Sequence, residues 1–447
     1  MRVPNVECLP YSTDTIALAE LLSEREGFVF LDSASASSAN QGLDILTCLP
    51  EQIIECQSTH PDDTEAFFRS WTSAYLRRRN AATLEYPFTG GWIGALSYDL
   101  GESLVGIRRG IEHQTQAVAF AAYYAWALVI DHTHKKCLWV DDGTDLGSEI
   151  RSIKQSIAAI LSVPQRTETL DQKPLSLAWT PVADRQHYET NFERIRSYLV
   201  AGDCYQINYA QAFRCQLTDS WHAYKTLRTR NAGPYSACLL NSPLADILCF
   251  SPELFIEVNG RDVKTRPIKG TASRHRDPQR DQEEADQLLG SSKNRAENVM
   301  IVDLLRNDLG RVCEPGSVQT TALCELTSYP TVHHLTSEVV GKLRADQTPI
   351  SLLEGSFPGG SITGAPKKRA MQIIRELEPE PRGIYCGTIF ALSNDGQLRS
   401  NICIRTISVS MSNATVWGGG GIVWDSTCGS EYRETLQKLS KILSSAD

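Results

Sequence analysis

One lysine of this chain stands in a setting where its amine could act as a nucleophile. Lys269 lies in the segment RPIKGTASR (266–274), where a proline and a glycine fix the local turn. An amine attacks carbon only when it is neutral, and a free lysine has a pKa of about 10.4. Burial would lower this pKa, and so would positive charge from Lys264, Arg266 and Arg274. The alternative is a solvated basic loop, which these residues taken alone favour.

The segment KNRAENVMIVDLLRNDLGRV (293–312) is expected to form a helix that ends at Gly310, with Glu297 on its apolar face. Steps of three and four residues lead from Glu297 to Met300, Ile301 and Leu304. A carboxylate on such a face needs a partner, because burying an unpaired charge costs several kcal/mol. The partner is either a salt-bridging arginine or a bound ligand, and this helix alone does not distinguish them.

The last predicted helix, Ser430 to Leu443, carries a second group of charged side chains. Glu431, Glu434 and Lys438 are three and four residues apart, so they lie on one side of it. The simplest interpretation is an exposed Glu434–Lys438 pair that contributes a few tenths of a kcal/mol. Two acidic helical sites would also suit Mg²⁺, which prefers oxygen ligands and is usually held by one or two carboxylates. The sequence does not show that Glu297 and Glu434 meet.

Four consecutive glycines and a strand arginine point to an anionic ligand. Gly418 to Gly421 form an unbroken run, although glycine in a strand loses more backbone entropy than any other residue. Backbone amides without side chains can approach a carboxylate closely. A bend or bulge in the sheet would explain the run as well. Arg405 lies in the apolar segment NICIRTISV (401–409), where a guanidinium needs an acceptor such as a carboxylate.

The elements that carry these residues predict an α+β protein. Neighbouring strands followed by helices favour layered antiparallel sheets over repeated βαβ units. A polar stretch with two prolines, residues 162–180, is the predicted linker, which divides the chain into residues 1–161 and residues 182–447. From apolar runs bounded by turn residues we expect strands at Phe28–Asp32, Gly91–Tyr98, Ala119–Asp131, Ala237–Leu240, Ile247–Phe250, Phe255–Val258, Gly387–Leu392, Ile402–Val409 and Thr415–Trp417.

The composition excludes several classes of protein. The chain has 447 residues, 41% of them apolar and 22% charged, as in an ordinary globular protein. Its net charge of −9 argues against a nucleic-acid partner or an anionic membrane surface. The longest uncharged apolar run, Ala117 to Ile130, is too short to span a bilayer and is predicted to be a buried strand. Its 13 cysteines include no C-x-x-C pair, so we expect neither a disulfide framework nor a zinc ribbon. Because no signal-peptide pattern is present, we expect a reduced, cytoplasmic setting.

Several strings of this sequence, taken together and in order, resemble the chorismate-utilising enzymes, and most closely the para-aminobenzoate branch of that family. They cover the chain from about residue 90 to its end, and the first ninety residues match more loosely. The resemblance implies an anthranilate synthase component I-like α+β sandwich of two orthogonally packed antiparallel sheets flanked by helices, with both parts of the chain intertwined in one globule. The strings are GGWIGALSYDLG (90–101), GDCYQINYAQ (202–211), SPELF (251–255), RPIKGT (266–271), RAENVMIVDLLRNDLGRV (295–312), HHL (333–335), FPGGSITGAPKKRAMQII (357–374), CIRT (403–406), GGGIVWDS (419–426) and SEYRET (430–435).

The resemblance implies a metal site and a substrate site at the residues discussed above. Glu297 and Glu434 would be Mg²⁺ ligands, with Glu431 beside them acting through water, and the metal would hold the ring carboxylate of chorismate. Asn294 stands where relatives often have an acidic residue, so no second acidic role is carried over to that position. The enolpyruvyl carboxylate would be bound by Tyr385, Arg405, Gly420 and Gly421, with Lys438 as a further carboxylate contact.

The resemblance makes Lys269 the residue that decides the product. Relatives that form anthranilate carry alanine here, which leaves C2 of the ring open to ammonia. A lysine would occupy C2 itself, expel the C4 hydroxyl and be released when ammonia attacks C4, which gives 4-amino-4-deoxychorismate. Glu253 would be the general acid and base of these steps. Thr271 and His334 would bind the C4 hydroxyl.

The resemblance also implies partners. The chain has no glutaminase nucleophile string, so a separate glutamine amidotransferase subunit would deliver the ammonia. Leu31-Asp32-Ser33 lies where relatives have a tryptophan-binding string, and its aspartate leaves tryptophan binding open. The alternatives within the family are an anthranilate synthase, against which Lys269 argues, and an isochorismate synthase. A non-catalytic ligand-binding regulatory subunit is a further alternative, and the intact Lys269, Glu253, Glu297 and Glu434 argue against it.

Overall fold

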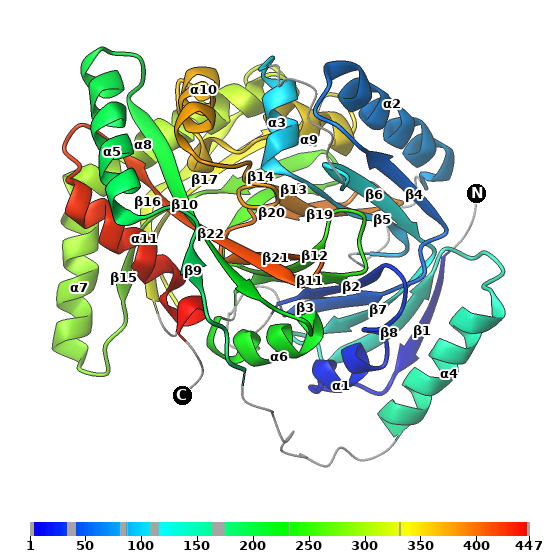
Figure 1. The fold of residues 1–447 in the computed structure, drawn as a ribbon. Coiled ribbons are helices and arrows are strands. Elements are labelled where there is room, and N and C mark those ends of the chain that lie inside the picture. The colour runs from blue at the N-terminus through cyan, green and yellow to red at the C-terminus, as the bar shows by residue number, and fades with distance from the viewer. Residues whose placement is uncertain are drawn as a thin grey trace.

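Two antiparallel β-sheets form the centre of the molecule, and helices cover their outer faces (Figure 1). The computed structural model describes residues 4–33, 42–80, 86, 88–107, 116–162, 175–231, 233–329 and 332–444. Within these ranges the sheets have 12 and 10 strands, and both contain strands from before residue 161 and after residue 182. Residues 163–174 of the expected linker lie outside the described ranges.

The larger sheet joins the two ends of the chain. N-terminal strands form one half of it and C-terminal strands the other, and β2 and β11 pair where the halves meet. In order across the sheet its strands are β1 (Asn5–Leu9), β8 (Lys136–Asp141), β7 (Trp126–Asp131), β3 (Leu43–Thr47), β2 (Phe28–Asp32), β11 (Tyr235–Leu240), β12 (Asp246–Ser251), β21 (Thr406–Ser410), β22 (Asn413–Ile422), β10 (Gln206–Gln216) and β18 (Gly364–Ala365), with β9 (Thr180–Pro181) also paired with β10.

The smaller sheet carries the RPIKGT segment at one of its edges. In order its strands are β15 (Ile268–Ser273), β17 (Val332–Lys342), β14 (Asp262–Arg266), β13 (Leu254–Asn259), β20 (Leu398–Asn401), β19 (Thr388–Ser393), β5 (Gly91–Leu96), β6 (Ala119–Tyr124) and β4 (Gln52–Cys56), with β16 (Gln319–Ser328) also paired with β17.

Helices surround the two sheets, and two of them carry the acidic residues of interest. α8 ends at Gly310 as predicted, and α11 begins two residues before the predicted start. In the described ranges no helix is long and apolar enough to cross a membrane. The helices are α1 (Thr15–Glu20), α2 (Pro61–Arg78), α3 (Tyr98–Leu104), α4 (Ser148–Ser162), α5 (Arg185–Val200), α6 (Ser220–Asn231), α7 (Pro278–Gly290), α8 (Ser292–Gly310), α9 (Pro349–Ser356), the 3₁₀ turn η1 (Gly360–Ile362), α10 (Lys367–Leu377) and α11 (Cys428–Leu443).

The space between the sheets is filled by apolar side chains from both of them. Val29 and Ile247 of the larger sheet belong to the same buried cluster as Ile93 and Ile389 of the smaller one. Burial of this surface is the main stabilising contribution to such a sandwich. All 13 cysteines are free thiols, which confirms the prediction that the chain has no disulfide framework.

Several strand predictions were wrong in their extent. The strand expected to reach Tyr98 ends at Leu96, and the one expected over Thr415–Trp417 runs from Asn413 to Ile422. The expected strand Ala119–Asp131 is two strands, because the chain breaks at Ala125 and passes from the smaller sheet (β6) to the larger one (β7). The expected strand Ile402–Val409 begins only at Thr406. The residue before it, Arg405, has a φ of 52°, a left-handed conformation that cannot continue a strand.

Candidate active site

A β-bulge displaces Lys269 from the regular ladder of the smaller sheet. Between two regular pairs of β15 and β17, Lys269 and Gly270 stand opposite a single residue. Gly270 has a φ of +85°, and an added Cβ there would lie 2.8 Å from Leu288 Cδ1, so glycine is required. The bulge aims the lysine at the turn before α10, where Lys269 Nζ donates a 2.8 Å hydrogen bond to the Ser361 carbonyl oxygen.

Glu253 lies beside this lysine and shares a partner with it. The Ser361 hydroxyl donates a 2.9 Å hydrogen bond to Glu253 Oε1, and the glutamate is only 5% exposed. Burial raises the pKa of Glu253, against the opposing effects of Lys269 and the Ser361 hydroxyl. Burial also lowers the pKa of Lys269, against the opposing charges of nearby carboxylates. Both shifts favour a neutral amine beside a neutral carboxyl group.

The positive charge near Lys269 in the folded chain does not come from the basic residues that the sequence suggested. Each of the three basic residues near Lys269 in the sequence pairs with a carboxylate: Lys264 with Glu257, Arg266 with Glu338, and Arg274 with Asp281. The positive charge that acts on Lys269 comes instead from Lys438 of α11. Because each of the three basic residues is neutralised by its own carboxylate, the sequence around Lys269 did not reveal the source of this charge.

Thr271 and His334 face each other across β15 and β17. They are a directly opposed pair, with 2.9 Å between Thr271 Oγ1 and His334 Nδ1. Burial lowers the pKa of His334 to about 4, and the charge of Arg405 adds to this effect. The imidazole is therefore neutral near pH 7, which leaves it able to donate and accept hydrogen bonds in the site.

The two acidic helices meet near the same place. Glu431 and Glu434 of α11 both raise the pKa of Glu297 on α8, after burial as the largest cause. Lys293, one turn before Glu297, has its Nζ 3.0 Å from Glu431 Oε1 and 4.0 Å from Glu297 Oε1. The exposed pair that the helix pattern favoured is also present, since Lys438 Nζ lies 2.7 Å from Glu434 Oε1.

Glu297, Glu431 and Glu434 offer only oxygen donors, and the Lys293 ammonium lies beside the first two of them. Within the described ranges no group of three or more His, Cys, Asp or Glu side chains converges closely enough to hold a metal by itself. Mg²⁺ is usually held by one or two carboxylates plus water and substrate oxygens, so Glu297 and Glu434 suit it as an open site. The ammonium of Lys293 lies between α8 and α11 where such an ion would be attracted.

The glycine run is a regular strand with one open edge. Gly418 to Gly421 pair in register with Gln211 to Asn208 of β10, so neither a bend nor a bulge explains the run. β22 pairs with β21 only as far as Val416, and beyond it alternate N–H groups point away from β10. Arg405 immediately precedes β21 at this open edge, and burial lowers its pKa. This edge can therefore receive a carboxylate.

Tyr385 and Lys438 complete the set of residues predicted from the sequence. The Tyr385 ring stacks on Trp417, the residue before the glycines, with 6.0 Å between ring centroids. Lys438 Nζ donates a 3.1 Å hydrogen bond to the Gly419 carbonyl oxygen. An added Cβ on Gly420 would lie 3.3 Å from Glu431 Oε2, so the glycines also let α11 pass closely over the strand.

Several residues of the site were missed by sequence reasoning. Ser361 lies inside the quoted string FPGGSITGAPKK, but nothing local shows which residues it contacts. Lys293 could have been found, because it lies four residues before Glu297 on the same helix. Behind the site, Arg382 forms a buried pair with Glu378 and donates a hydrogen bond of 3.1 Å to the Ile362 carbonyl oxygen.

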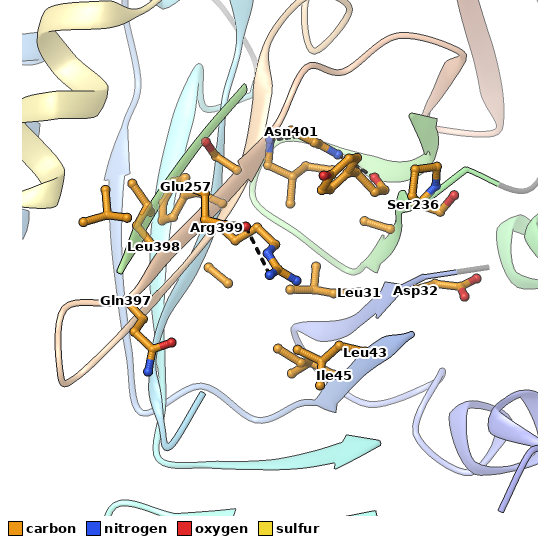
Figure 2. Close-up of a pocket in the computed structure, with 18 of the residues that line it drawn as sticks. Leu31, Asp32, Leu43, Ile45, Ser236, Glu257, Gln397, Leu398, Arg399 and Asn401 are labelled. Atoms are coloured by element: carbon orange, nitrogen blue, oxygen red, sulfur yellow. Dashed lines mark hydrogen bonds and ion pairs between the residues drawn. The ribbon is translucent and has the colours of Figure 1, made fainter. Parts of the chain in front are cut away.

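A cavity lined by other residues lies between the two sheets (Figure 2). Its volume is about 140 Å³. Leu31, Leu43 and Ile45 form an apolar wall, and Arg399 faces them while Nη2 lies 3.2 Å from Glu257 Oε2. Apolar walls with a few charged groups are typical of small-molecule sites.

The aspartate of the Leu31-Asp32-Ser33 string also borders this cavity. Figure 2 shows the Asp32 carboxylate pointing away from the apolar wall. Two side chains bind it there: Arg228 Nη2 lies 3.0 Å from Oδ1, and the Tyr224 hydroxyl donates a 2.8 Å hydrogen bond to Oδ2. Asp32 thus stabilises the contact between β2 and α6.

Comparison with known proteins assigns the chain to a family. The chorismate binding enzyme family matches residues 28–444. Aminodeoxychorismate synthase component 1 of Klebsiella aerogenes is 40% identical over 361 residues, which are 80% of this chain and 77% of that protein. The protein of the same name from Bacillus subtilis (strain 168) is 33% identical over 463 residues, 98% of this chain and 96% of that one.

A solved structure has the same fold. Anthranilate synthase component I from Streptococcus pneumoniae TIGR4 superposes with a TM-score of 0.73 and 28% sequence identity, covering 99% of this chain and 92% of that one. This likeness and the two antiparallel sheets flanked by helices confirm the predicted fold class. The chain belongs to the family of chorismate-binding enzymes.

Proposed function

We propose that this chain is the synthase subunit of an aminodeoxychorismate synthase, which converts chorismate and ammonia into 4-amino-4-deoxychorismate and water. The observation that carries the proposal is Lys269, displaced by a bulge and held by Ser361 beside Glu253. The names of the relatives from Klebsiella aerogenes and Bacillus subtilis support the same reaction.

The side chains would supply a balanced exchange in two steps. The neutral Lys269 Nζ attacks C2 of the ring, the two ring double bonds shift, and the C4 hydroxyl leaves as water with a proton from Glu253. Ammonia then attacks C4, the double bonds shift back, and the C2–Nζ bond breaks with its electron pair returning to the lysine. The new ammonium group gives one proton to the Glu253 carboxylate, which restores both side chains.

The surroundings support this pairing of acid and nucleophile. The first step needs Lys269 neutral and Glu253 protonated at the same time, and burial shifts the pKa of each group in that direction. The neutral His334 and Thr271 would bind the C4 hydroxyl. Because all these groups are fixed by strands or buried hydrogen bonds, little reorganisation is required when the substrate binds.

Each of the two carboxylates of chorismate would bind at a separate site. Arg405, Tyr385, Lys438 and the Gly420–Gly421 segment, one of whose two N–H groups points away from β10, would hold the enolpyruvyl carboxylate at the open edge of β22. Glu297 and Glu434 would hold Mg²⁺, with Glu431 beside them acting through water. When bound, the ion supplies positive charge that holds the ring carboxylate.

The ammonia would come from a separate glutamine amidotransferase subunit. The designation "component 1" of the relatives supports a second component. Free ammonium at high concentration should replace that partner. The 13 free thiols support localisation in a reducing compartment such as the cytoplasm.

The decisive experiment is product identification. The purified chain is incubated with chorismate, Mg²⁺ and ammonium, and the products are separated by chromatography and identified by mass. 4-Amino-4-deoxychorismate is the expected product. Anthranilate or isochorismate as the main product would overturn the para assignment. No turnover with ammonium or with a glutaminase partner would favour a non-catalytic ligand-binding subunit.

Tryptophan is the proposed occupant of the second cavity. The apolar wall of Leu31, Leu43 and Ile45 would receive the indole ring, and the Arg399–Glu257 pair would meet its carboxylate and ammonium groups. Asp32 is held by Arg228 and Tyr224 and would take no direct part. Calorimetric titration with tryptophan tests this proposal, and Leu43→Trp, which fills the cavity, should abolish the binding. Absence of heat in the unsubstituted chain would refute it.

A further inference from the structure

Ser361 hydrogen-bonds both of the groups that the proposed reaction requires. Its carbonyl oxygen accepts from Lys269 Nζ at 2.8 Å, and its hydroxyl donates to Glu253 Oε1 at 2.9 Å. Ser361 is 6% exposed and lies 92 and 108 residues from these partners along the chain. One residue thus sets the distance between an amine on β15 and a carboxyl group before β13.

The turn that presents Ser361 is fixed on several sides. Arg382 Nη1 donates a 3.1 Å hydrogen bond to the Ile362 carbonyl oxygen. The backbone N–H of Asn208 donates one of 2.9 Å to the Thr363 carbonyl oxygen. An added Cβ on Gly360 would lie 2.5 Å from Leu304 Cδ2, so α8 packs directly on the turn. The backbone carbonyl of Ser361 therefore has a fixed position that no side-chain substitution at this residue removes.

We infer that Ser361 is a positioning residue for the amination of chorismate: its carbonyl aims the Lys269 amine at one ring carbon, and its hydroxyl orients the Glu253 carboxyl group toward the leaving hydroxyl. This inference rests on the proposed function. The two roles belong to different atoms of one residue. Truncation of the hydroxyl consequently separates them, because it frees Glu253 and leaves the lysine contact in place.

The electrostatic consequence concerns Glu253. Burial raises its pKa, while Lys269, the Ser361 hydroxyl, the Ile268 backbone and Lys438 lower it. The Cys386 thiol is a further titratable group near this carboxyl. A hydroxyl that donates to a carboxylate stabilises the charged form. Loss of the hydroxyl must raise the pKa of Glu253 further.

The test compares Ser361→Ala with Ser361→Thr and with Ser356→Ala. Ser356 is a matched control, since it is buried near the same turn and its hydroxyl has no hydrogen-bond partner in the described part of the chain. For Ser361→Ala we expect kcat to fall about tenfold with little change in KM, because the hydroxyl orients an acid rather than binding substrate. One limb of the pH–rate profile reflects the titration of Glu253 and should be absent in Glu253→Gln. In Ser361→Ala this limb should move upward by roughly one pH unit. Ser361→Thr should restore both values, and Ser356→Ala should leave them unchanged.

The inference is overturned if Ser361→Ala keeps the wild-type pH profile, or if Ser361→Thr loses as much activity as alanine. If the alanine variant does not fold, Ser361→Cys, with a weaker donor of similar size, must give an intermediate shift. Infrared difference spectra of the carboxyl region between wild type and Glu253→Gln report the same titration without substrate. A wild type that does not aminate chorismate would refute the proposed function, and this spectrum would still decide whether the Ser361 hydroxyl stabilises the Glu253 carboxylate.

Discussion

Lys293 Nζ lies 3.0 Å from Glu431 Oε1, which joins the first turn of α8 to the first turn of α11. The same ammonium lies 4.0 Å from Glu297 Oε1. A lysine therefore neutralises part of the negative charge that the two helices bring together. A divalent cation entering this place would compete with it, so Lys293 should weaken metal binding.

Replacing this lysine should strengthen metal binding. In Lys293→Met the carboxylates of Glu297 and Glu431 lose a neighbouring cation, and we expect the Kd for Mg²⁺ to fall about tenfold. Calorimetric titration of Mg²⁺ without chorismate measures this directly. Lys441→Met, which removes an exposed lysine from α11, is the control. Glu434→Gln should instead weaken Mg²⁺ binding at least tenfold, and unchanged Mg²⁺ affinity in both variants would remove these residues from the metal site.

Lys269→Ala should change the product as well as the rate. Without the amine, C2 of the ring is open to ammonia, so para amination should fall at least a hundredfold and anthranilate should appear. Chromatography with mass detection after incubation with chorismate, Mg²⁺ and ammonium gives both quantities. Lys342→Ala, at an exposed position on β17, should behave as wild type. Para amination at the wild-type rate in Lys269→Ala would exclude the lysine as nucleophile.

Neighbouring glycines of β22 should respond differently to alanine. On Gly420 an added Cβ would lie 3.3 Å from Glu431 Oε2 and 3.6 Å from Glu434 Oε1, distances that small side-chain shifts can accommodate. Gly420→Ala should therefore fold but crowd Glu434 and Lys438 on α11, with KM for chorismate raised about tenfold.

The next glycine has no such space. A Cβ on Gly421 would lie 2.1 Å from Nε2 of Gln206, a side chain that is 1% exposed. Gly421→Ala should lower the free energy of unfolding by about 1–3 kcal/mol, the usual cost of overpacking. Thermal unfolding and substrate kinetics on both variants check the contrast. A Gly421→Ala protein as stable as wild type would contradict it.

Local signals in the sequence located many of the elements. The strand Phe28–Asp32 matches β2 residue for residue, and the helix over 293–312 ends at Gly310 as its glycine predicts. Aromatic and branched residues bounded by turn formers, and an apolar stripe with a C-terminal glycine, are properties of contiguous residues. They can be read without knowledge of the rest of the chain.

Non-local contacts set the features that were missed. The apolar run Ala119–Asp131 contains no turn signal, yet it breaks at Ala125 because its two halves pair in different sheets. The bulge at Lys269 exists only relative to β17, and its hydrogen-bond partner Ser361 comes 92 residues later. The two glutamate helices could be predicted separately, but their meeting at Lys293 could not.

His334 should make the stability of the chain depend on pH. Its pKa is lowered to about 4 by burial, whereas an unfolded histidine has a pKa of about 6.5. Between these two pKa values the imidazole is protonated in the unfolded chain and neutral in the folded chain. The resulting stability is fully present above about pH 6.5 and is lost as the pH falls toward 4.

The expected loss attributable to this residue is about 3 kcal/mol over that window, from a shift of about 2.5 pKa units. Denaturant unfolding between about pH 7 and pH 4 measures it in wild type and in His334→Gln. Because other groups also titrate there, the quantity of interest is the difference between the two slopes, with the exposed His60→Gln as a reference. His334→Gln should be less stable than wild type near pH 7 and should lose less stability on acidification, since it has no proton to take up. Parallel stability curves for wild type and His334→Gln would show that this imidazole is protonated equally in the folded and unfolded chains.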